Sequence, residues 1–265
     1  METHLEHCGG AFVSRAGISP KKQFFNRLKR HAAGQLFLDV WPGYAPLFDG
    51  TTHRLPGKVR EMLELWQTNN TLKRESVESY AAYEGGDMID VGAFHGWYSW
   101  LLAPKTRAGD RFISCEPDER VINDLLRNLA TFAKVFPRIP QTFISQPVGN
   151  GGALTVQNPG GGHPQFGSDM TAEGDRKSVT LDALAATLGV RPAFVKIDVE
   201  GAEFGVLQGM ERLLADVHPK IMLEIHPQWQ PPGVTVEQVR GLLAKHGYRA
   251  GEADTSAVAV RQLWT

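Results

Sequence analysis

The chain has 265 residues, of which 42% are hydrophobic, and a formal net charge of -1. This length and composition suit one α/β domain with an appendage, large enough to bury a hydrophobic core. The near-neutral charge excludes a whole-chain electrostatic footprint for nucleic acid or an anionic membrane, so we expect neither partner. The sequence leaves the oligomeric state open.

The sequence also indicates a cellular compartment. It contains two cysteines, Cys8 and Cys115, and we do not expect a disulfide between them. No apolar run approaches the roughly 20 residues that a membrane helix needs. The first residues include Glu2 and Glu6 and lack the apolar region of a signal peptide. We therefore expect a cytoplasmic protein.

Residues 1–84 carry no chemical signature and are expected to form a tail and a helical cap. The first 20 residues lack periodicity and predict a loose tail. His4, His7 and Cys8 lie close together there, but such clusters are usually solvated, and we expect no metal site. A basic amphipathic helix is expected over 21–31, a strand over 36–40, and helices near 58–66 and 72–83.

Residues 86–99 predict a buried strand, a tight glycine turn and an apolar helix. A dinucleotide dehydrogenase has G-x-G-x-x-G at such a turn, because the backbone approaches a pyrophosphate there. This chain has Asp90-x-Gly92-x-x-x-Gly96. That pattern suits a ligand that lacks a phosphate but carries a positively charged amino acid tail. S-adenosylmethionine (SAM) is such a ligand. The alternative is a strand–turn–helix without a ligand.

Further strands and helices alternate after this turn. A second strand over 111–116 ends at Glu116-Pro117 and precedes a helix. Glu116 lies roughly 20 residues past the glycines, where a carboxylate can accept hydrogen bonds from ribose hydroxyls. A third strand over 142–146 would bring Gln146 to the adenine edge. A glycine-rich excursion over 149–178, with a hairpin strand at 154–157, is expected to cover the site, with His163 either contacting the substrate or solvated.

The second strong pattern is an apolar strand over 194–198 that ends at Asp198, with Glu200 two residues later and a helix over 203–214. The next strand, over 220–225, contains Glu224 and is followed by His226. Ligands of open parallel sheets bind outside the carboxyl ends of the strands, so these acids should converge there. A helix over 236–246 and an antiparallel pair, from 248 onward and over 258–263, complete a mainly parallel seven-stranded sheet with helices on both faces.

Four stretches, in order, resemble the FkbM family of SAM-dependent methyltransferases. The family pattern runs roughly D-V-G-A-N-x-G, E-P, I-D-V-E-G-x-E and E-x-H, and this chain has DVGAFHG at 90–96, EP at 116–117, IDVEGAE at 197–203 and EIH at 224–226. The resemblance covers about residues 76–228. Phe94 and His95 depart from it, because the family usually has Asn and a small or aliphatic residue there.

The resemblance implies a Rossmann-like class I methyltransferase domain over 85–265, with residues 1–84 as its N-terminal helical cap. It implies SAM as the cofactor and methyl transfer to a hydroxyl of a small molecule, such as a sugar or natural product. Two alternatives stay open: a non-catalytic SAM-binding or interaction module, and a nucleotide-dependent oxidoreductase, which the missing G-x-G-x-x-G disfavours.

The expected site follows from these motifs. For the cofactor we expect Asp90, Gly92, Ala93, Phe94, Gly96, Glu116, Pro117 and Gln146, and for the substrate Glu200 and His163. His226 is the first candidate for a general base, because imidazole titrates in the right range, and Glu224 would orient it. Asp198 is the competing base. Catalysis by positioning alone is the third possibility.

Overall fold

The computed structural model describes residues 5–8, 11–14, 43–46, 52–55, 57, 59–60, 70–157, 165–167, 176–256 and 258–265. Within these, seven strands form one sheet in the order β13-β14-β12-β11-β5-β6-β7. The strands are β5 (Asp87–Val91), β6 (Phe112–Cys115), β7 (Gln141–Ile144), β11 (Pro192–Ile197), β12 (Lys220–Ile225), β13 (Asp254–Thr255) and β14 (Val260–Trp264).

The pairing of these strands confirms the predicted fold class. From β12 through β11, β5 and β6 to β7 all neighbours are parallel, whereas β14 and β13 pair antiparallel. The observed β12 coincides with the predicted strand, and the other core strands differ by a few residues at their ends. The result is a mainly parallel, Rossmann-like seven-stranded sheet.

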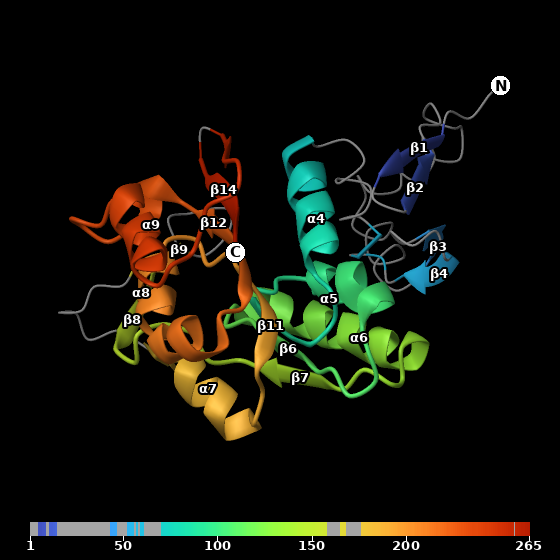
Figure 1. Cartoon of the computed structure of the whole chain (residues 1–265). Helices are drawn as coiled ribbons and strands as arrows, with labels where there is room; N and C mark the ends of the chain where they lie inside the picture. Colours follow the sequence, from blue (N-terminus) through green and yellow to red (C-terminus); the bar gives the residue numbers. More distant parts are fainter. Residues whose placement is uncertain are drawn as a thin grey trace.

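Helices cover both faces of this sheet (Figure 1). They are α4 (Asn70–Ala82), α5 (Trp97–Leu102) and α6 (Glu119–Val135) on one face, and α7 (Leu181–Leu188), α8 (Glu203–Gln208) and α9 (Val236–Lys245) on the other. None of the described helices is long and apolar enough to cross a membrane.

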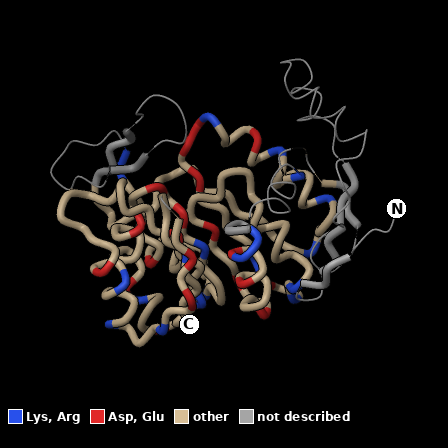
Figure 2. The backbone as a smooth tube through the Cα atoms, turned by 90° about the horizontal axis from the view of Figure 1, so that it is seen from above, with Lys and Arg blue, Asp and Glu red and all other residues tan. Residues whose placement is uncertain are grey.

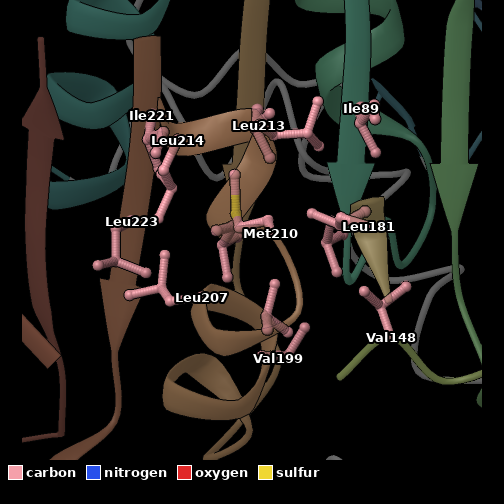
Figure 3. Packing of buried hydrophobic residues seen from close by; sticks show 14 of the residues in the cluster. Ile89, Val148, Leu181, Val199, Leu207, Met210, Leu213, Leu214, Ile221 and Leu223 are labelled. Atoms are coloured by element: carbon pink, nitrogen blue, oxygen red, sulfur yellow. The ribbon is translucent and has the colours of Figure 1, made fainter. Parts of the chain in front are cut away.

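The two faces follow from the alternation of side chains along each strand. The even-numbered residues Met88, Phe112, Phe194 and Met222 pack with α4, α5 and α6, where Tyr83, Trp100 and Phe132 fill the layer. Their neighbours Ile89, Ile113, Val195 and Ile221 pack on the opposite face. There they meet Leu181, Leu207, Met210 and Leu213 from α7 and the segment that begins with α8 (Figure 3).

The segment after β11 differs from the single predicted helix over 203–214. Helix α8 ends at Gln208, and a π-helix, η2, spans Leu213–Val217. Gly209 lies so close to the Gly149 carbonyl that a Cβ would come within 2.0 Å of its oxygen. Beyond this break, the Asp182 carboxylate accepts hydrogen bonds from the backbone N–H groups of Arg212 and Leu213, both 2.9 Å long, so that the chain begins a second helical turn there.

The remaining described strands lie outside the main sheet. Strands β1 (Leu5–Cys8) and β2 (Ala11–Ser14) pair antiparallel, in place of the loose tail expected there, and β3 (Gly43–Pro46) pairs with β4 (Thr52–Leu55). The predicted hairpin strand is β8 (Ala153–Gln157), between β9 (Gln165–Gly167) and β10 (Arg176–Lys177). The predicted helix over 21–31, the strand over 36–40 and His163 fall outside the described residues.

Candidate functional site

Neighbouring strands β5 and β11 mark the point where the strand order reverses. From β5 the chain continues outward through β6 and β7, and it then returns to place β11 and β12 on the other side. Ligands of such sheets bind outside the carboxyl ends of the strands at this switch point. The two turns meet there, because the Asp198 N–H donates a 3.0 Å hydrogen bond to the Val91 carbonyl.

The turn after β5 is held by its own hydrogen bonds. The N–H groups of Gly92 and Ala93 donate to the Cys115 carbonyl at 2.9 and 3.0 Å, and Gly96 donates to the Ala93 carbonyl at 2.7 Å. Phe94 adopts a left-handed conformation with φ of 50°. Asn adopts that region more readily than bulky residues do, so Phe94 strains a turn at which the FkbM pattern has Asn.

Glu116 organises this turn. Its Oε2 accepts a 2.8 Å hydrogen bond from the Phe94 N–H, and its Oε1 accepts one of 2.8 Å from the Asp118 N–H. Each carboxylate oxygen has two lone pairs, so each can still accept a second hydrogen bond from a ligand. Burial raises the pKa of Glu116 to about 7, although the two backbone hydrogen bonds oppose this shift.

Asp90, at the end of β5, is more deeply enclosed. It is 2% exposed, and its Oδ2 is buried with no hydrogen-bond partner in the described part of the chain. Burial raises its pKa to about 7, with Lys196 opposing the shift and the carboxylates of Asp198 and Glu116 adding to it. The acids that were predicted to converge at this edge are therefore close enough to change one another's pKa values.

On the face of the sheet covered by α4 and α5, the apolar layer gives way to a charged one towards the carboxyl edge. The layer begins with Lys196, which lies beside Asp90 in the register of β11 and β5. Its Nζ lies 3.2 Å from Glu75 Oε1 and 3.3 Å from Asp198 Oδ2. Although its burial favours the neutral amine, the surrounding acids raise the pKa of Lys196, so it stays charged.

Lys196, Glu75, Tyr98 and Arg261 were not among the residues expected at the site. The Tyr98 hydroxyl donates a 2.5 Å hydrogen bond to Glu75 Oε1, and Arg261 pairs with both Glu224 and Glu75. A lysine inside the apolar run Phe194–Ile197 is a signal in the sequence, because buried charges need partners. No pattern singled out Glu75 within its helix.

His226 lies at the end of β12 and is 4% exposed. Its Nδ1 is 3.0 Å from Glu203 Oε1, and its ring stacks on Trp229 with centroids 4.9 Å apart. Burial lowers the pKa of His226, but the hydrogen bond with Glu203 and the nearby carboxylates of Glu224 and Asp198 outweigh it and raise the pKa to about 10. The expectation that this imidazole titrates near its ordinary range was therefore wrong, because Glu203 was not foreseen as its partner.

The acids around His226 differ in their charge states. Lys196 and His226 hold the pKa of Asp198 below its ordinary value despite its burial, whereas burial and the charge of Asp198 raise the pKa of Glu224. Burial raises the pKa of Glu200 to about 7. Glu200 also has a φ of 52°, a strained conformation for a non-glycine residue that is typical of functional turns.

The other expected residues lie apart from this cluster or engage elsewhere. Gln146 follows β7 and is exposed. The Pro117 carbonyl accepts a 2.6 Å hydrogen bond from Arg176. Acidic and basic residues are interspersed along the described backbone (Figure 2). The structure thus places Asp90 and Glu116 beside the turn after β5, and groups Asp198, Glu200, Glu224 and His226 at the ends of β11 and β12.

Known proteins offer a comparison with this arrangement. A sequence model of the methyltransferase FkbM domain matches residues 90–250. No curated protein sequence matches the chain. Among solved structures, the chain is similar to methyltransferase FkbM from Methylobacillus flagellatus, with 14% identity and a TM-score of 0.49 over 78% of this chain. The chain spans 60% of the length of that protein.

Two further solved structures are similar to the chain. The Aeropyrum pernix fibrillarin, solved with bound SAM, has 12% identity and a TM-score of 0.47 over 86% of this chain and 84% of its own. The precorrin-6y C5,15-methyltransferase from Geobacter metallireducens has 14% identity and a TM-score of 0.42 over 75% of this chain and 90% of its own.

Proposed function

Because the chain belongs to the FkbM methyltransferase family, we propose that it transfers the methyl group of SAM to a hydroxyl of a small molecule, such as a sugar or natural product. Two carboxylate oxygens beside the switch point favour a hydroxyl as the methyl acceptor. Asp198 Oδ1 and Glu200 Oε2 are buried and accept no hydrogen bond from any residue that the structure describes. A hydroxyl donates one hydrogen bond and therefore complements such an oxygen.

The donor would bind across the ends of β5 and β6. Glu116 is the candidate for the ribose, because both of its oxygens are fixed by backbone N–H groups and keep a free lone pair. Asp90 offers a buried oxygen beside the same turn that no described residue hydrogen-bonds, and the cationic amino group of SAM is complementary to it. Gly92, Ala93, Phe94 and Gly96 would shape the surface between these two acids, with Pro117 flanking it.

Methyl transfer is an in-line displacement, so catalysis depends first on holding the acceptor oxygen opposite the sulfur. The hydroxyl proton must leave as the new O–C bond forms. Without a bound cation, the surrounding acids raise the pKa of His226 to about 10, so its ring then donates hydrogen bonds and is not available as a base. Asp198 is the better-placed candidate proton acceptor, because its Oδ1 accepts no hydrogen bond from any described residue, although its lowered pKa makes it a weak base.

The test is a screen with methyl-labelled SAM against sugars, polyols and natural products that carry hydroxyls. The expected product is a methyl ether. On the acceptor identified, Asp198→Asn should lower kcat by about 10²–10⁴-fold with near-normal SAM affinity, whereas His226→Ala should change kcat less. The exposed Asp216→Asn serves as a control. Methylation only at nitrogen or carbon would contradict the proposal, and SAM binding without turnover on any acceptor would support the non-catalytic module instead.

A further inference from the structure

Three carboxylates from separate positions surround the Nε2 atom of His226. Glu200 Oε2 and Glu224 Oε1 each lie 3.5 Å from it, and Asp198 Oδ1 lies 3.9 Å away. These separations exceed the usual 2.7–3.2 Å of an N–H···O hydrogen bond. They are close to the roughly 3.0–3.5 Å between donor atoms that share one metal ion at about 2.1 Å. The three carboxylate oxygens therefore all lie near the same ring nitrogen.

The other side of the imidazole is fixed by the protein. Nδ1 lies 3.0 Å from Oε1 of Glu203, whose side chain is fully buried, and Gln230 donates to the second oxygen of Glu203. The ring also stacks on Trp229. A carboxylate on one ring nitrogen fixes the tautomer and turns the other nitrogen towards a metal, an arrangement typical of metal-binding histidines.

Two of the three oxygens that face Nε2 have no other role in the described structure. Asp198 Oδ1 and Glu200 Oε2 are buried and accept no hydrogen bond there. Leaving a buried acceptor unsatisfied is costly, more so for a charged group. Both unsatisfied oxygens point to the same nitrogen, so one bound ion would satisfy them together.

The local charge balance favours a cation. Five carboxylates meet around the site, those of Glu75, Asp198, Glu200, Glu203 and Glu224. Only Lys196 and Arg261 face them as permanent cations among the described residues. With His226 neutral, as metal binding requires, the five carboxylates exceed these two cations, and a bound divalent cation would offset much of the remaining negative charge.

We propose that Asp198, Glu224 and His226 bind a divalent transition-metal cation, with Glu200 beside it as a fourth ligand and third oxygen donor. Ligand atoms of the first three lie within 4.8 Å of one another. One imidazole with several carboxylates suits Mn²⁺ better than Ca²⁺ or Mg²⁺, which prefer oxygen alone. This reverses the expectation of no metal site. Cation binding stands on the geometry; a role in orienting the acceptor hydroxyl rests on the proposed function.

The test is a titration of the chelator-treated, full-length protein with Mn²⁺, followed by the loss of the electron paramagnetic resonance signal of free Mn²⁺. We expect one tightly bound Mn²⁺ per chain. Asp198→Asn and Glu224→Gln should each weaken binding at least tenfold. Glu211→Gln, an exposed acid before η2, is the matched control and should bind as the wild type does. Circular dichroism establishes that each variant is folded.

Two results would overturn the proposal: no binding to the folded wild type up to a concentration on the order of 1 mM, or binding that neither Asp198→Asn nor Glu224→Gln weakens. If Glu224→Gln does not fold, Asp198→Asn alone decides. SAM titration by calorimetry on the same samples separates the two proposals. Mn²⁺ binding without SAM binding contradicts the proposed function alone, and SAM binding without Mn²⁺ binding contradicts the cation site alone.

Discussion

Gly92 lies directly against the main-chain carbonyl of Asp198, so that a Cβ on residue 92 would come within 1.7 Å of the Asp198 oxygen. The φ of Gly92 is 81°, a backbone angle that residues other than glycine rarely adopt. The sequence pattern placed Gly92 in the cofactor site. In the structure, the contact between the turns that follow β5 and β11 already requires a glycine at this position.

Gly92→Ala should therefore destabilise the protein itself, by about 3–5 kcal/mol, because overpacking and backbone strain add. Urea denaturation without any ligand measures this change. Gly241→Ala is the control, because a Cβ there meets nothing within 4 Å and alanine favours the helix α9. A Gly92→Ala protein of normal stability that merely fails to bind SAM would contradict this account.

Glu116→Gln tests the ribose contact. It keeps the size of the side chain but removes the negative charge and one acceptor, so SAM should bind about 10–100-fold more weakly, or roughly 1.5–3 kcal/mol. Glu119→Gln, an exposed acid in the first turn of α6, should bind SAM normally. Calorimetry measures both. Unchanged affinity in folded Glu116→Gln would remove this carboxylate from the cofactor site.

The pKa values of Asp90 and Glu116, both raised to about 7, set a pH dependence of stability. A carboxyl with a raised pKa binds its proton more tightly in the folded protein, so its contribution is fully present below its unfolded pKa and is lost as pH rises through 7. The raised pKa of His226, about 10, also makes stability fall as the pH rises, beginning at the ordinary histidine pKa of about 6.5. The ligand-free protein should therefore lose stability from pH 6 to pH 8.

Thermal unfolding across this range measures the effect, which is at most about 1.4 kcal/mol per pH unit for each group. Asp90→Asn removes one of the titrating groups, so its stability should fall less steeply with pH. A wild-type stability that increases from pH 6 to pH 8 would show that other groups control it. SAM affinity should change in the opposite direction, because Glu116 accepts hydrogen bonds best as a carboxylate.

Lys196→Met should destabilise the protein by about 3–5 kcal/mol, because it leaves Glu75 and Asp198 buried without their cation. Adding Glu75→Gln to this variant should recover part of the loss. Lys220→Met, which breaks the surface pair with Glu84, should cost about 1 kcal/mol or less. Denaturant titration of the wild type, Lys196→Met, Glu75→Gln and the double variant gives the coupling, and strictly additive losses would show that Lys196 and Glu75 do not interact.

The sheet could be predicted because its signals are local. Each core strand is a short apolar run that ends at a turn, and Lys220–Ile225 matches the prediction residue for residue. The hydrophobic periodicity after Glu203 predicted one helix through Leu214, but the chain turns at Gly209. The close approach of the Gly149 carbonyl, from a distant loop, accompanies this break and leaves no trace in the periodicity.

The acids of the site could be located but not their partners. Motif positions at strand ends indicated Asp90, Glu116 and Asp198, because parallel strands end at one edge. The protonation of His226 depends on Glu203, which lies at the start of the preceding helix and had been assigned no role. A sequence pattern gives the position of a titrating group, but its pKa depends on groups that tertiary packing brings next to it. The division of the chain at residue 84 stays a prediction.

Two residues outside the matched region 90–250 complete the charge network inside it. Glu75 faces Lys196, and Arg261 pairs with Glu224. The two flanking residues also contact each other, with Arg261 Nε 3.5 Å from Glu75 Oε2. A fragment cut to the matched boundaries would expose Lys196 and Glu224 without these counter-charges. Chimaeras that exchange the flanking segments would likewise change the electrostatics of the site while every FkbM motif stays intact. The segments before β5 and after α9 are therefore a place where related enzymes can diverge in chemistry without changing their motifs.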